Sequence, residues 1–404
     1  MSRILTNNYN YNQLPSPENQ LVINCAHPVL NRQTIDLSHR LLQMKLDWNV
    51  VLNLAHQHSV LPLLNRNLKH LVIHLGTNFI PDDIMQILES HQQQTAIDNL
   101  YRAGELSIIL DDFDEANIET LVFKGPAVAL SCYGNIGLRN FSDLDLLIPE
   151  CKVLKAREIL IRRGFKAAGN LTAHQQQRFL SSGYHWSFTR STDDLVLEVH
   201  WRITPRYFSF PLEITSLWQR RVVLNLPRKK AFQPSPEDCL LALCAHGAKH
   251  AWERLVWISD VAHLLQTNEH IDWNTVIKRA QTLRSVRLLL LGLWVAHKVL
   301  GSPLPFMIRE RITRDAGISK ITRTIQSRLL RREHSPPNFL ELLIMHLSTR
   351  ESWQDALRYG YRVALVPSIA DYRMMSLPSE LSFLYYAARP FRLATDYVKR
   401  LHDK

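Results

Sequence analysis

Apolar side chains in the first hundred residues recur at the spacing of helices that bury one side. Positions from Leu41 to Ala55 are apolar every three or four residues, which places them on one helical face. Pro62 can open the next helix, because a helix tolerates proline in its first turn. A third segment, from Pro81 to about Asn117, keeps helical spacing without an internal proline. The pattern therefore predicts an N-terminal helical region over residues 1–105.

The middle of the chain changes to short runs of β-branched and aromatic residues, which predict strands. The predicted strands are Ile118–Phe123, Asp143–Ile148, Tyr184–Thr189 and Leu195–Trp201. An amphipathic helix over Cys151–Arg163 ends at Gly164, a residue that commonly follows a helix. We therefore expect an α+β fold in which a small mixed sheet, within a domain over residues 106–225, is flanked by helical regions.

The pattern after a basic connector is helical again. Ser235 can cap a helix that has Pro236 at its first position and acidic residues in its first turn. Gly301 ends another apolar helix that runs from Leu288 to Leu300. A C-terminal helical domain is predicted over residues 230–404.

Composition limits the class of protein. No apolar run approaches the roughly 20 residues that a membrane span needs, and the polar start lacks the apolar segment of a signal peptide. The 5 cysteines have no CxxC spacing, so neither a disulfide framework nor a zinc knuckle is indicated. We expect a cytoplasmic protein without a membrane span.

The charge balance is basic and uneven. The chain carries 48 Lys and Arg against 37 Asp and Glu, a net charge of +11, and the residues from Gly301 onward hold 17 basic against 10 acidic side chains. Such a balance favours anionic partners such as nucleotides or RNA, or it belongs to an ordinary solvated helical surface.

Three acidic residues on two predicted strands carry the most specific chemistry. Asp143 and Asp145 are two positions apart, so they face the same side of their strand. Glu198 lies on a second strand with Val196 and His200 on its face, and it joins the pair if the two strands are neighbours. Crowded carboxylates favour a divalent cation, and oxygen ligands suit Mg²⁺ holding substrate phosphates. Three carboxylates can hold two ions, one at the attacking hydroxyl and one at the leaving pyrophosphate.

Basic residues near these acids are candidates for nucleotide binding. The Lys124-Gly125 turn ends one strand and begins a helix, where backbone amides can reach phosphate. Arg139 is four residues before Asp143 and within reach of polyphosphate oxygens. Paired acids on a strand and a single KG turn are each common in solvated surfaces. The prediction of metal and nucleotide binding therefore depends on their occurring together.

A second cluster lies further along, where His246, Lys249, His250 and Arg254 follow helical spacing. A cationic face lining a nucleotide cleft is one interpretation, with Lys249, His250 and Arg254 as nucleotide-binding residues. HxxxH could instead bind zinc, although the glutamate of HExxH is absent, and partly buried structural histidines are the third possibility. Asp260 is expected to orient Arg254 or a histidine.

The run KGPAVALSCYGNIGLRNFSDLDLLI resembles the nucleotidyltransferase superfamily of DNA polymerase β type. It is more closely similar to an uncharacterised bacterial nucleotidyltransferase family, whose pattern is KG, an aliphatic helix, Tyr, Arg and DxDLL. The similarity extends to Ala55–Leu64, Glu198–Trp201 and Leu243–Leu265. Pro126 departs from the superfamily's usual Gly-Ser or Gly-Gly turn and has no N–H to donate, and the gap from this turn to Asp143 is longer than in the superfamily's usual motif.

The resemblance implies Mg²⁺-dependent transfer of a nucleoside monophosphate from an NTP to an acceptor hydroxyl. Asp143, Asp145 and Glu198 would be the catalytic metal ligands, Glu198 would also assist deprotonation, and Gly125 would belong to the phosphate turn. The acceptor is a small molecule, a protein or an RNA. A toxin-like enzyme acting on tRNA or protein, a non-catalytic nucleotide-binding module, and a zinc hydrolase built on His246 and His250 are the alternatives.

Overall fold

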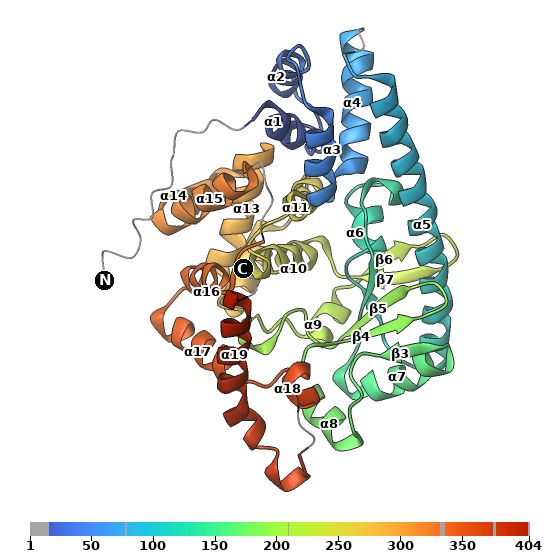
Figure 1. The fold of residues 1–404 in the computed structure, drawn as a ribbon, viewed down its shortest axis with the longest axis vertical. Coiled ribbons are helices and arrows are strands. Elements are labelled where there is room, and N and C mark those ends of the chain that lie inside the picture. The colour runs from blue at the N-terminus through green and yellow to red at the C-terminus, as the bar shows by residue number, and fades with distance from the viewer. Residues whose placement is uncertain (1–15, 77–78, 209, 332–335, 375–376, 403–404) are drawn as a thin grey trace.

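The protein is described by a computed structural model of residues 16–402, apart from residues 77–78, 209, 332–335 and 375–376. Helices surround a small twisted sheet, and helices from the two ends of the chain lie beside each other (Figure 1). The fold is α+β, as the sequence predicts. Among the described residues, no helix is both long enough and apolar enough to cross a membrane.

The N-terminal region consists of helices, as the apolar spacing predicts. They are α1 (Pro17–Asn24), α2 (Arg32–Leu42), α3 (Trp48–Gln57), α4 (Leu61–Leu75) and α5 (Asp82–Glu115). Asp47 caps α3 by accepting the N–H groups of Asn49 and Val50. α5 is 34 residues long and runs along one edge of the molecule (Figure 1).

One mixed sheet occupies the middle of the chain. Its strands are β1 (Leu121–Val122), β2 (Asp143–Leu147), β3 (Phe165–Ala167), β4 (His185–Arg190) and β5 (Leu195–His200), in the order β1-β2-β5-β4-β3. Only β2 and β5 of this sheet pair in parallel, and Asp145 lies opposite Glu198. The first predicted strand, Ile118–Phe123, shortens to the two residues of β1, because Phe123 already leads into the Lys124 turn.

Short helices and a hairpin complete this part. They are α6 (Pro126–Ser131), η1 (Ile136–Leu138), η2 (Glu150–Lys152), α7 (Val153–Arg162), α8 (Ala173–Ser182), η3 (Arg206–Phe208), α9 (Ile214–Gln219), β6 (Val222–Asn225) and β7 (Lys230–Gln233). The basic connector, which runs from Arg220 to Lys230, thus leads into the antiparallel hairpin β6–β7. Apolar alternation did not indicate this hairpin, because Val222 and Val223 are both exposed.

The C-terminal region is helical, as predicted. Its elements are α10 (Pro236–Lys249), α11 (Leu255–Thr267), α12 (Trp273–Thr282), α13 (Val286–Leu300), α14 (Phe306–Thr313), α15 (Ala316–Leu329), α16 (Phe339–Ser348), α17 (Trp353–Leu365), α18 (Ile369–Met374), η4 (Ser379–Leu381) and α19 (Leu384–His402). Ser235 accepts the N–H of Asp238 at the start of α10, and Gly301 ends α13 with a left-handed φ of 61°.

Two clusters of buried apolar side chains hold the fold together. The larger one joins α1–α4 to α10–α15, so helices from both ends of the chain share one core. The smaller one lies between the sheet, α7 and α8. α5 belongs to both, since Ile84 and Leu88 pack in the first cluster and Leu106 and Phe113 in the second. This arrangement turns the inner strands that carry the acidic residues toward the end of α10.

Candidate functional site

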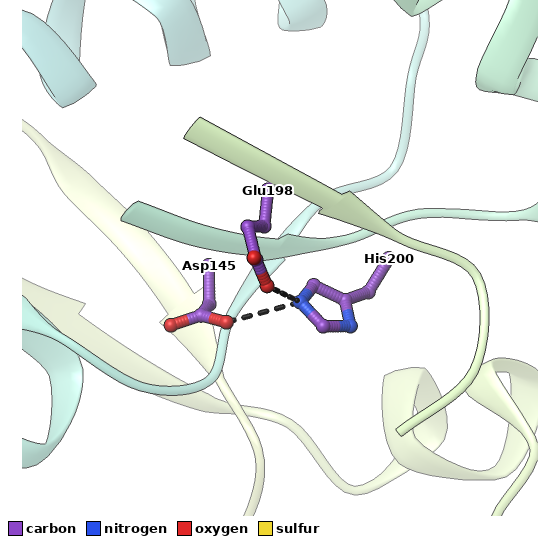
Figure 2. Close-up of side chains that lie close together, drawn as sticks. All are labelled: Asp145, Glu198 and His200. Atoms are coloured by element: carbon purple, nitrogen blue, oxygen red, sulfur yellow. Dashed lines mark hydrogen bonds and ion pairs between the residues drawn. The ribbon is translucent and has the colours of Figure 1, made fainter. Parts of the chain in front are cut away.

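Two parallel strands bring a pair of carboxylates together. Asp145 on β2 and Glu198 on β5 are direct neighbours in the ladder, while the alternate residues Leu144 and Leu197 point into the apolar core. Both carboxylates lie close to His200, two positions after Glu198 (Figure 2). The sequence prediction that Glu198 faces the aspartate strand therefore matches this register.

His200 links the two carboxylates. Its Nε2 is 3.0 Å from Oδ1 of Asp145 and 3.0 Å from Oε2 of Glu198. An N–H on Nε2 donates to both oxygens, which leaves Nδ1 without a hydrogen-bond partner among the described residues. The imidazole is buried and stacks on the ring of His185, whose Nε2 lies 3.4 Å from Oε1 of Glu198.

Lys124 supplies the positive charge beside Asp145. Its Nζ lies 2.7 Å from Oδ1 of Asp145, and the ammonium is mostly buried. Burial would lower the pKa of Lys124, but attraction from Asp145 outweighs it and raises that pKa. Lys124 is thus a charged lysine at neutral pH, in contact with the acid that it helps to hold.

The acids respond to this environment in opposite directions. Burial would raise the pKa of Asp145, but Lys124 and His200 hold it well below its usual range. Burial acts likewise on Glu198, and the hydrogen bond from His200 lowers the pKa of that carboxyl to about 2. Asp143 has a raised pKa, because it is desolvated and repelled by Asp145 more strongly than Lys124 compensates. The three carboxylates are therefore crowded into one partly desolvated site beside Lys124.

The Lys124-Gly125 turn is fixed by its closeness to β2. Gly125 has a φ of 52°, and a Cβ there would come 3.1 Å from the carbonyl oxygen of Asp143. The turn offers few amides to a phosphate, since Pro126 has no N–H and the Ala127 N–H donates to the Lys124 carbonyl at 3.0 Å. The ammonium group of Lys124 is therefore a better candidate for phosphate binding than the backbone of the turn.

Lys249, at the end of α10, approaches the acids from the helical side. Its Nζ is 3.3 Å from the hydroxyl of Tyr184 and lies over that ring. Burial and the charge of Lys124 lower the pKa of Lys249 to about 8. Tyr184, which immediately precedes β4, was not singled out in the sequence, because nothing in a lone tyrosine distinguishes it from a core residue.

The histidines at the end of α10 are half-buried. Burial, with repulsion from Lys249, lowers the pKa of His250 to about 3, and burial holds the pKa of His246 well below its usual range. Their rings contact each other and Trp257. Within the described residues, the group of side chains that could hold a metal is Asp145, Glu198 and His200, so the zinc alternative on His246 and His250 has no third ligand.

Arg139 is paired with an acidic residue of α11. Its Nε and Nη2 donate to the two oxygens of Asp260 at 2.7 and 2.8 Å, and both side chains are buried. Tyr133 donates to the same carboxylate at 2.8 Å. Asp260 thus orients Arg139 instead of Arg254 or a histidine, and nucleotide binding by Arg139 stays a prediction.

Arg254 lies at the end of a strained loop. Ala251 and Trp252 both have left-handed φ values, 55° and 54°, which cost free energy for residues other than glycine. Trp252 is fully buried against Gly247, where a Cβ would collide with its ring, and against Gly292, where a Cβ would collide with Cys244 and press on the ring. This anchor holds the loop, so that Lys249 faces the acids while Arg254 lines a separate cavity of about 360 Å³.

The donor set fits a divalent cation. Asp145, Glu198 and His200 each offer a ligand atom, all within 4.8 Å of one another, and Asp143 adds a crowded carboxyl two residues from Asp145. Carboxylate oxygens are the ligands that Mg²⁺ prefers. His200 was placed on this face by strand alternation, but only the structure shows it between the acids.

The comparison with known families agrees with this geometry. The family described as uncharacterised nucleotidyltransferase matches residues 44–301, which include the acidic strands, the Lys124 turn and the α10–α11 loop. No match to a curated protein accompanies it. Because the matched segment covers more than half of the 404 residues, the chain belongs to this uncharacterised nucleotidyltransferase family.

Proposed function

We propose that the protein is a Mg²⁺-dependent nucleotidyltransferase of DNA polymerase β type. The oxygen of an acceptor hydroxyl attacks the α-phosphorus of an NTP, its proton passes to a base, and pyrophosphate leaves. The observation that carries this proposal is the pairing of Asp145 with Glu198 across two parallel strands, with Asp143 two residues away.

The residues have distinct roles in this reaction. Asp143, Asp145 and Glu198 would hold magnesium, which when bound polarises the phosphates and lowers the pKa of the attacking hydroxyl. Glu198 would also assist removal of the hydroxyl proton, whose pKa the bound metal lowers. His200 orients both carboxylates through Nε2. Positioning of this kind supplies much of the acceleration in phosphoryl transfer.

Cations of the chain receive the triphosphate. Lys124 lies at the acidic pair and Lys249 beside Tyr184, so the two ammonium groups flank the carboxylates from the sheet and from α10. Both are charged at neutral pH, given the raised pKa of Lys124 and the value of about 8 for Lys249. His250 is neutral and is proposed to contact the nucleotide as an uncharged hydrogen-bonding group.

The test is transfer of label from an α-labelled NTP. Purified protein, Mg²⁺ and a fractionated lysate are incubated with each NTP, and Asp145→Asn runs beside Asp83→Asn, a control change at an exposed position on α5. The proposal is supported if the unmodified and Asp83→Asn proteins transfer label and Asp145→Asn does not. The labelled fraction, whether small molecule, protein or RNA, then identifies the acceptor class. Binding of NTP without transfer in any fraction would indicate a non-catalytic nucleotide-binding module.

A further inference from the structure

A second polar site is the cavity of about 360 Å³ that Arg254 lines. Its walls come from the end of α3 and the start of α4, from α5, from the segment before β2 and from the α10–α11 loop. The volume is at the lower end of small-molecule pockets, which are about 300–1,000 Å³. It therefore suits one small ligand or one part of it.

The chemistry of the walls is that of an anion site. Arg254, His56 and His91 face the cavity together with Ser59 and Asn140, and no Asp or Glu belongs to the lining. No carboxylate pairs with Arg254 in the part of the chain that the structure describes. A guanidinium without a protein counter-charge, beside hydrogen-bond donors, matches the geometry of phosphate and carboxylate groups.

The walls are held in place by contacts between distant segments. Ser59 has a left-handed φ of 58°, and the preceding His58 accepts the Val256 N–H at its carbonyl and the Leu255 N–H at Nδ1, at 3.2 and 3.4 Å. These bonds tie the end of α3 to the start of α11, directly after Arg254. Strained backbone on both sides of one cavity is typical of sites that are preformed for a ligand.

The position of the cavity relates it to the reaction. Asn140 is three residues before Asp143, so at most about 11 Å of chain separates the wall from the first acid. Lys249, the last residue of α10, faces the acids, and Arg254, at the other end of the anchored loop, lines the cavity. The cavity therefore lies near the strand that carries Asp143, on the side lined by the N-terminal helices.

We propose that this cavity binds the phosphate or carboxylate group of a small acceptor molecule, so that its hydroxyl reaches the acidic pair. The proposal rests on the proposed nucleotidyl transfer. It assigns Arg254 to the acceptor, whereas Lys124 and Lys249 serve the NTP. The N-terminal helices are then part of the active site through acceptor binding.

Calorimetric titration of the full-length protein tests this assignment. The probes are inorganic phosphate, glucose 6-phosphate, gluconate and, as the uncharged control, glucose. Loss of one charged hydrogen-bonding partner weakens binding by about tenfold or more. We expect that loss in Arg254→Gln, at an exposed position, but not in Arg309→Gln, an exposed arginine on α14. His56→Glu, also at an exposed position, should weaken binding because its added carboxylate repels the anion. Glucose should not bind.

A non-hydrolysable NTP analogue with Mg²⁺, titrated into the same proteins, separates the two sites. Its affinity should be unchanged in Arg254→Gln and lost in Asp145→Asn. Failure of every anion to bind the unmodified protein at millimolar concentration, while the analogue still binds, overturns the acceptor site and leaves the proposed function standing. Loss of analogue binding in Arg254→Gln also overturns it, because the cavity then holds the nucleotide. If only the anions bind, the proposed function fails and the acceptor assignment fails with it.

Discussion

The buried contact between Arg139 and Asp260 should contribute strongly to stability. It joins the segment before β2 to α11, and Asp260 accepts three hydrogen bonds of 2.7–2.8 Å from Arg139 and Tyr133 while fully buried. Asp260→Asn keeps the shape but removes the negative charge and turns an acceptor into a donor. Arg139 then remains charged and buried without a counter-charge, which typically costs about 3–5 kcal/mol. Whole domains are stable by only about 5–15 kcal/mol.

Urea unfolding followed by circular dichroism measures the loss, and hydrogen exchange over residues 126–139 and 255–267 locates it. Glu310→Gln is the matched control, since it removes one charge from an exposed pair with Arg314 and should cost less than about 1 kcal/mol. The double variant Arg139→Met with Asp260→Leu should recover much of the loss, because no unpaired charge is left. The reasoning would be refuted if Asp260→Asn cost no more than the control. It would also be refuted if both segments kept the hydrogen-exchange protection that they have in the unmodified protein.

Three further results are expected. Lys249 has a pKa of about 8 in the folded protein, below the usual lysine value near 10.4, so the unfolded chain binds more protons between these pH values and stability should rise with pH there. The KM for NTP should rise over the same range, and both trends should be absent in Lys249→Met, as urea titrations and steady-state kinetics would show. Gly125→Ala should destabilise more than Gly134→Ala in thermal unfolding, by about 1 kcal/mol or more, since both have positive φ but only Gly125 lies against the Asp143 carbonyl; equal effects would exclude that contact. Gly247→Ala should cost about 1–3 kcal/mol by overpacking Trp252, whereas Gly360→Ala on α17, where a Cβ meets nothing, should be neutral or stabilising; equal unfolding midpoints would contradict the packing.

Strand alternation was sufficient to predict which face of each strand carries the acidic residues. Asp143, Asp145 and Glu198 follow the two-residue period, and Leu144 and Leu197 are buried as that period requires. The neighbouring strands could not be paired from the sequence alone, because β3 and β4 intervene in the chain between β2 and β5.

Contacts between distant residues were not predictable from spacing. Arg139 meets Asp260 across 121 positions, and no local pattern distinguishes that pairing from a free arginine aimed at phosphate. The helical spacing of Lys249 and Arg254 suggested one cationic face, but α10 ends at Lys249 and the strained loop separates the two side chains. Hydrophobic periodicity describes each element and carries no information about which elements meet.

The seating of Trp252 against two glycines has an evolutionary consequence. Position 247 on α10 is small because the indole of Trp252 fills the space beside it, and position 292 on α13 is small because Cys244 and the same indole crowd it. Positions 247 and 252 should therefore change together among family members, whereas a larger residue at 292 also needs a smaller one at 244. Such covariation would trace which lineages keep the loop geometry that separates Lys249 from Arg254.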